Sequence, residues 1–183
     1  VLRDAWQVAL DIDTIVEALL EVATRTPWDA LLGRMPGLER TALALVVDPL
    51  VGVAALPAAY STGWFHWPGN PETGETGDSA VVAYEAGIVA RIAERDDLLA
   101  FARPIADAWR AFLAERDQAL RDEPDRPVRT PRGELTLVGV LEAQRLHAAQ
   151  HYRQATTFLA SQGETVPALD LASLYGMRLP EAV

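Results

Sequence analysis

Hydrophobic residues recur every three or four positions over several long stretches of the chain, the spacing expected for one buried face of an α-helix. In the first stretch, residues 4–24, this apolar series is Val8, Ile12, Ile15, Leu19 and Val22. Further helices are expected at about residues 39–60, 80–93, 104–121 and 136–161, with a short helical turn at 28–32. No segment shows a convincing strand pattern of alternating apolar and polar residues. The pattern predicts an all-α fold, a four-helix bundle with short extra helices, as a single domain over residues 1–183.

Capping residues, prolines and glycines suggest where these helices begin and end. Ser79 and Thr136 are expected N-caps, and Gly163 is expected to stop the last helix. Pro49 and Pro57 lie inside the second segment, where either can kink a helix. The stretch 122–133 is rich in proline and charge and predicts a surface connection. Leucines recur in the tail and predict a short helix against the core: Leu169, Leu171, Leu174 and Leu179.

Composition narrows the class of protein. The 183 residues are 50% hydrophobic, but no uninterrupted apolar run of 18 residues occurs, so no membrane span is expected. Acidic residues near the start, in place of the basic region of a signal peptide, favour a cytoplasmic location. The net charge of −10 argues against nucleic acid as a partner. The absence of cysteine excludes disulfides, thiolate metal sites and a cysteine nucleophile.

Two of the three histidines, His147 and His151, lie four residues apart in the last predicted helix. This spacing places both imidazoles on one helical face, one turn apart, where they can reach a single metal ion. A metal site in a helical bundle needs a further ligand from another helix. Asp48 is the candidate, because it is the only charge in the apolar run 43–51 and a buried carboxylate needs a partner.

Structural explanations compete with each of these assignments. Two histidines at this spacing are often partly buried residues hydrogen-bonded to neighbours. Asp48 precedes Pro49, and aspartate before proline commonly caps a new helical segment. The third histidine, His66, stands in an aromatic loop, where it either lines a pocket or packs on a tryptophan.

The same residues carry a resemblance to a known family. The run Gly133-Glu134-Leu135-Thr136-Leu137, followed by Leu141-Glu142 and by His147-Ala148-Ala149-Gln150-His151-Tyr152-Arg153-Gln154, resembles the last core helix of the DinB/YfiT-like superfamily of four-helix metal proteins. Arg40-Thr41-Ala42-Leu43, Pro57-Ala58-Ala59-Tyr60 and Gly63-Trp64-Phe65-His66-Trp67-Pro68 are similar to its second helix and the following loop. The tail 170–180 is also similar, so the resemblance spans most of the chain.

In that superfamily three side chains, usually histidines, bind a divalent metal: one on the second helix and two on the last. The resemblance therefore implies His147 and His151 as metal ligands, with Asp48 at the position of the usual second-helix histidine. Two outcomes are open. Either Asp48 replaces that histidine as a ligand, or Pro49 bends the helix away and the site is broken. Members include thiol-dependent transferases and isomerases, the metal-binding domain of sulfoxide synthases and proteins of natural-product pathways, and homodimers are common among them.

The resemblance implies a metal-dependent enzyme acting on a small molecule: a thiol-linked transferase, isomerase or hydrolase, with a biosynthetic pathway as one setting. The metal would be zinc, nickel, iron or manganese, with Asp48, His147 and His151 as ligands and catalytic groups. A low-molecular-weight thiol is the expected co-reactant, and it must come from a cofactor or substrate because the chain has no cysteine.

Three residues are further binding candidates: Gln154, Arg153 and Trp64. Gln154 lies one turn from His151 and can orient a ligand. For Arg153 a salt bridge to a neighbouring helix is the competing role, and for Trp64 it is holding the loop together.

A second function from a different class stays open. In it the chain is a metal-free descendant of the fold. It binds a ligand, acts as an accessory protein, or catalyses a rearrangement with Asp48 and the histidines as acid–base groups. The missing second-helix histidine and the apolar run 43–59 favour this reading.

Overall fold

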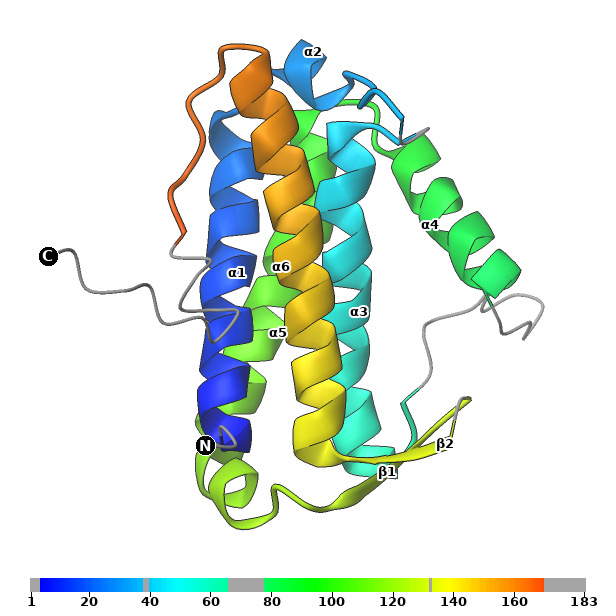
Figure 1. Cartoon of the computed structure of the whole chain (residues 1–183), viewed down its shortest axis with the longest axis vertical. Coiled ribbons are helices and arrows are strands. Elements are labelled where there is room, and N and C mark those ends of the chain that lie inside the picture. The colour runs from blue at the N-terminus through cyan, green and yellow to red at the C-terminus, as the bar shows by residue number, and fades with distance from the viewer. Residues whose placement is uncertain (1–3, 38–39, 66–77, 132, 170–183) are drawn as a thin grey trace, which may run out of the picture.

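The computed structural model describes residues 4–37, 40–65, 78–131 and 133–169. Its elements are α1 (Ala5–Arg25), α2 (Trp28–Leu31), α3 (Ala42–Thr62), α4 (Asp78–Arg91), α5 (Arg95–Asp122), β1 (Pro127–Thr130), β2 (Gly133–Thr136) and α6 (Leu137–Ser161). The long helices α1, α3, α5 and α6 lie side by side, whereas α4 leans out beside α3 (Figure 1). The expected all-α class is confirmed for the described residues.

The last helix, α6, lies between α1 and α3 and runs antiparallel to α3 (Figure 1). On the other side, α5 packs against α1 and α3 and closes the core. Because α6 and α3 share a long interface, polar side chains that face each other across it meet inside the protein. This interface is where the histidine pair and Asp48 lie.

The third helix is the most thoroughly buried element. Its side chains are apolar nearly all round, and most of them lie in the core. It is the only helix in the described part of the chain that is long and apolar enough to cross a membrane, with a mean hydropathy of 2.0 over 18 residues. However, 72% of that window is buried inside the protein, and a central core helix has the same composition.

Side-chain caps fix where three of the long helices begin. The side chains of Asp4, Thr41 and Thr136 accept hydrogen bonds from the backbone N–H groups of Gln7, Ala44 and Gly139, respectively. Each such cap satisfies a donor that has no partner within its own helix. The predicted N-cap at Thr136 is therefore confirmed.

Helix ends are also set by glycines with positive φ. Gly63 (φ 69°) follows α3, and Gly163 (φ 86°) follows α6 at the predicted stop. Left-handed backbone of this kind is readily adopted only by glycine.

The structure corrects several predicted boundaries. The fifth helix begins at Arg95, nine residues before Pro104, because a capping box of Glu94 and Asp97 starts it there. The fourth helix begins at Asp78, so Ser79 lies inside it and is not its N-cap. Residues 164–169 form no helix, and the remaining tail leucines lie outside the described residues.

A short antiparallel hairpin was not predicted. In it β1 pairs with β2, with Pro127 opposite Thr136 and Thr130 opposite Gly133. Only Val128 of the two strands is buried. A strand pair without a buried face needs no alternation of apolar and polar residues, so the sequence gives no strand signal there. The stretch 122–133 therefore connects α5 to α6 through a strand as well as a loop.

Candidate metal centre

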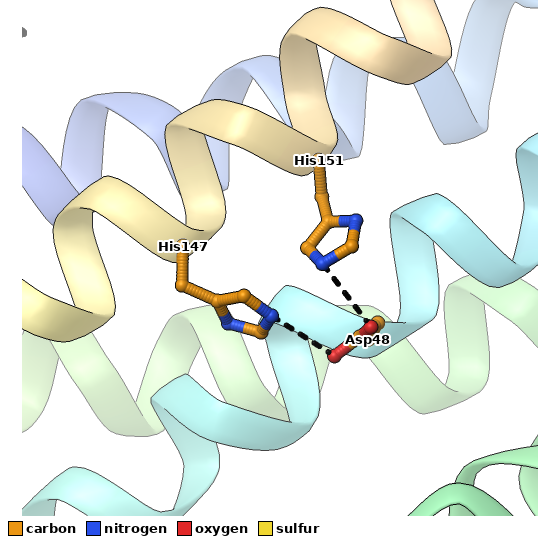
Figure 2. Close-up of side chains that lie close together, drawn as sticks. All are labelled: Asp48, His147 and His151. Atoms are coloured by element: carbon orange, nitrogen blue, oxygen red, sulfur yellow. Dashed lines mark ion pairs between the residues drawn. The ribbon is translucent and has the colours of Figure 1, made fainter.

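Asp48 and the two histidines meet at the interface of α3 and α6. His147 and His151 project from adjacent turns of α6 toward Asp48 on α3 (Figure 2). Nε2 of His147 lies 3.5 Å from Oδ1 of Asp48, and Nε2 of His151 lies 3.3 Å from Oδ2. The two imidazole rings stand at 89° to each other with centroids 4.5 Å apart. The three residues singled out by spacing and by isolated charge therefore form one cluster.

The helix that holds Asp48 is not broken at Pro49. It runs without interruption from Ala42 to Thr62 through both internal prolines. Its N-cap is Thr41, so Asp48 sits within the helix and does not cap a new segment. Of the two outcomes left open by the resemblance, the one in which Pro49 carries Asp48 away from the histidines is wrong.

The separations of these atoms fit a shared cation. One ligand atom from each of the three side chains can be chosen so that all lie within 4.8 Å of one another. Two ligands about 2.0–2.1 Å from a tetrahedral ion are themselves about 3.3–3.4 Å apart, close to the two nitrogen–oxygen distances found here. Two imidazoles and a carboxylate are also a donor set that zinc, iron, nickel and manganese accept. The cluster can hold a divalent metal ion.

Two further charged residues complete the cluster. Nη1 of Arg40, just before α3, lies 2.6 Å from Oδ2 of Asp48, and Nη2 of the same guanidinium lies 3.0 Å from Oε2 of Glu85 on α4. Asp48 and Glu85 are both buried, while the side chain of Arg40 is 33% exposed. One arginine therefore bridges two buried carboxyl groups from different helices.

Neighbouring groups favour an ionised Asp48 in spite of its burial. Burial alone raises the pKa of a carboxyl, but the two imidazoles, Arg40 and a hydrogen bond with Glu85 outweigh it and hold the pKa of Asp48 below its usual range. Neutral imidazoles carry no charge, so at neutral pH Arg40 is the cation that keeps Asp48 ionised.

The two histidines, unlike Asp48, are kept in their uncharged state by burial. Burial lowers the pKa of His147, and it lowers that of His151 to about 4, against the attraction of Asp48. At neutral pH both rings are uncharged and Asp48 is a carboxylate. These are the protonation states in which such groups bind metal ions.

Glu85 differs from Asp48 although the two carboxyls are close. Burial, the charge of Asp48 and a hydrogen bond to it raise the pKa of Glu85 to about 7, and Arg40 opposes this only in part. Near neutral pH, Glu85 is therefore protonated in a large fraction of molecules and donates to Asp48. The site contains one firmly ionised and one readily protonated carboxyl group.

The other predicted binding residues lie in different places. Gln154 is half-buried one turn from His151, and a hydrogen bond from its side chain acts to raise the pKa of His151. Neither Nδ1 of His151 nor Oε1 of Gln154 has a partner at full hydrogen-bond geometry. Gln154 therefore lies next to the imidazole of His151. Residues in such positions commonly orient a metal-bound histidine.

Arg153 and Trp64 are not part of the cluster. Arg153 is exposed on α6. Trp64 follows the C-terminal end of α3, about 20 Å along the helix axis from Asp48. Its backbone forms an isolated β-bridge with Arg129 of β1. Their assignment as binding residues stays a prediction, and His66 lies outside the described residues.

Arg40 and Glu85 were missed as site residues by reasoning from the sequence. Arg40 lies eight residues from Asp48 and 45 from Glu85, so no local spacing links the three. A buried carboxylate needs a cationic partner, so a partner for Asp48 could be expected. The chain has many arginines, however, and this rule does not say which of them it is.

Comparisons of the chain with protein-family models, curated proteins and solved structures found no match.

Proposed function

We propose that Asp48, His147 and His151 bind a divalent metal ion, and that the protein is a metal-dependent enzyme acting on a small molecule. Within this proposal the helical fold is a four-helix bundle of the DinB/YfiT-like type, with Asp48 in place of the usual second-helix histidine. The observation that carries the proposal is the convergence of both Nε2 atoms on one buried carboxylate, at 3.5 and 3.3 Å.

The surroundings of the histidines support a cation between them and Asp48. An uncharged imidazole carries one N–H and one lone pair. If Nδ1 of His151 carries the hydrogen and faces Gln154, its Nε2 lone pair faces a carboxylate oxygen, and two acceptors repel each other. His151 and Asp48 would hold a metal ion there, and its positive charge would remove this repulsion. Gln154 would then fix the tautomer and the orientation of the ring.

A metal ion bound there would act as a Lewis acid, lowering the pKa of a bound water or thiol or polarising a carbonyl group. The protein's own residues supply the setting. Asp48 and the histidines would hold the ion, and Arg40 and Glu85 lie next to the Asp48 carboxylate. The side chain of His147 is 25% exposed, which marks the side from which a substrate reaches the centre.

The reaction class we propose is a thiol-linked transfer or isomerisation, or a hydrolysis. The chain has no cysteine, so any thiol nucleophile comes from a low-molecular-weight cofactor or the substrate. Glu85, with its pKa raised to about 7, is suited to exchange a proton with a bound molecule at neutral pH.

The contact between Arg40 and Asp48 favours a second candidate, a metal-free protein that uses the same groups for binding or acid–base catalysis. At 2.6 Å, Arg40 already supplies a cation to Asp48, so the carboxylate does not depend on a metal for a partner. In this candidate the histidines and Glu85 transfer protons, and no ion is bound.

Metal analysis separates the two. The protein is purified without a histidine tag and dialysed against zinc, nickel, iron(II) or manganese, and bound metal is measured for wild type and His151→Ala. The metal-enzyme proposal predicts about one equivalent in wild type and a large loss in the variant. No bound metal in either protein would eliminate it and leave the metal-free candidate, whereas stoichiometric metal that requires Asp48 would eliminate the latter.

A further inference from the structure

The guanidinium of Arg40 is shared between two carboxyl groups. Nη1 bonds to Oδ2 of Asp48 at 2.6 Å, and Nη2 bonds to Oε2 of Glu85 at 3.0 Å. An arginine next to a single carboxylate commonly closes on it with two parallel bonds, one to each oxygen. Here only one nitrogen of the fork reaches Asp48, because the other is engaged by Glu85.

Because Arg40 shares its two nitrogens between two carboxyl groups, only one oxygen of Asp48 accepts a bond from it. Oδ2 accepts the bond from Arg40, while Oδ1 lies toward Nε2 of His147. If Arg40 turned to bond both oxygens, Oδ1 would be covered by an N–H group and by a positive charge. A cation could not then approach Oδ1 without displacing the guanidinium.

We propose that Glu85 is a positioning residue, which keeps Arg40 from closing on Asp48 and so leaves Oδ1 of Asp48 free to bind a metal ion. Glu85 touches neither the metal nor the substrate in this role. It acts through Arg40, and it makes the site depend on three helical segments instead of two. The inference rests on the proposed metal function.

Burial and charge support this role. The side chain of Glu85 is only 9% exposed, and its carboxyl has the guanidinium of Arg40 as its ion-pair partner. Without Glu85, Arg40 would bring its positive charge beside a divalent cation with one carboxyl partner, Asp48, instead of two. Glu85 therefore removes an obstacle in two ways: it holds the guanidinium by one end, and it offsets the guanidinium's charge.

The test is the zinc affinity of metal-stripped, tag-free protein at pH 8, measured by competition with a chromophoric chelator. The proteins are wild type, Glu85→Gln, Arg40→Gln, the double variant R40Q/E85Q and a control, Glu21→Gln. Glu21 pairs with Arg25 on the surface of α1, away from the cluster. Thermal unfolding of each protein shows that it is folded.

We expect Glu85→Gln to weaken zinc binding by about 10- to 100-fold, the range typical of residues that orient a metal ligand. In the Arg40→Gln background there is no fork to restrain, so the same substitution should change the affinity by less than about threefold. Glu21→Gln should bind zinc as wild type does. A purely structural role of Glu85 would weaken binding equally in both backgrounds.

Three results would overturn the inference. Glu85→Gln could bind zinc as tightly as wild type, or it could weaken binding to the same extent with and without Arg40; either result leaves the metal site itself standing. If wild type binds neither zinc nor nickel, iron(II) or manganese, the proposed function fails and this inference falls with it.

Should Glu85→Gln not fold, Glu85→Asp replaces it in both backgrounds. This variant keeps the charge but withdraws the carboxyl by about 1.5 Å, the length of one carbon–carbon bond. A loss of affinity that needs Arg40 would again support positioning, and its absence would overturn it.

Discussion

Nε2 of Gln144 donates a 3.1 Å hydrogen bond to the main-chain carbonyl oxygen of Pro49, joining α6 to α3 directly beside Asp48. Gln144 is buried one turn before His147, on the face of α6 that carries the two histidines. The bond therefore ties the helix that holds the imidazoles to the helix that holds the carboxylate.

Replacing Gln144 by alanine should destabilise the protein by about 2 kcal/mol, since it removes a buried hydrogen bond and leaves a cavity. Chemical denaturation monitored by circular dichroism measures this difference. Gln118→Ala, at an exposed position on α5, is the matched control and should stay within about 0.5 kcal/mol of wild type. Equal stability of the two variants would show that the Gln144 bond contributes little.

Zinc should raise the melting temperature of the wild-type protein. Free zinc at 100 times its dissociation constant adds about 2.7 kcal/mol, which for a protein of this size corresponds to a shift of about 5–10 °C. Asp48→Asn should show almost no shift, because the amide has lost the ligand charge. Asp117→Asn, which alters an ion pair with Arg121 on α5, should keep the full shift. A full shift in Asp48→Asn would remove Asp48 from the ligand set.

The imidazole of His151 should titrate near pH 4 in the metal-free protein, since burial lowers its pKa from 6.5 to about 4. A depressed folded-state pKa contributes stability that is present above pH 6.5 and lost as the pH falls through about 4. Proton NMR of the ring signals, assigned with His151→Gln, measures the titration directly. An ordinary midpoint near 6.5 would show that burial does not dominate the surroundings of the ring, because only burial outweighs the attraction of Asp48, which raises the pKa.

Glu85 should have the opposite effect on the pH dependence of stability. Its folded-state pKa is raised from 4.5 to about 7, so its contribution is fully present below pH 4.5 and is lost as the pH rises through about 7. In metal-free protein, wild type should therefore lose stability relative to Glu85→Gln across this window. Denaturation curves from pH 4.5 to 8 measure the difference. Parallel pH profiles for the two proteins would show that the Glu85 carboxyl has an ordinary pKa.

The parts of the site that the sequence predicted are those with a local signature. His147 and His151 were identified because the helical repeat places positions four apart on one face. Asp48 was identified because a single charge in an apolar helix must find a partner inside the protein. Neither signal depends on knowing which helices pack together, and all three residues lie where these arguments place them.

Arg40 and Glu85 could not be predicted in the same way. Arg40 lies eight residues before Asp48 and before the start of α3, so no helical-face rule links the two, and Glu85 reaches Arg40 because α4 packs against α3, which is a property of the tertiary arrangement. Glu85 lies on a helix with no clear division into apolar and polar faces, so nothing in its neighbours marks it as inward-facing. The early start of α5 is different, because the capping pair Glu94 and Asp97 that begins it is a local feature of the sequence.

The hairpin of β1 and β2 connects the C-terminal end of α3 to the N-terminal end of α6, the two helices that carry the candidate metal centre. Gly63 and Phe65, after α3, exchange main-chain hydrogen bonds of 2.9 and 2.7 Å with Arg129 of β1, and β2 leads directly into α6. One residue inserted between Thr136 and Leu137 would rotate every later position of α6 by about 100° and advance it by about 1.5 Å. The hairpin therefore acts as a spacer, and a length change there would separate Asp48 from the two histidines although all three residues are still present.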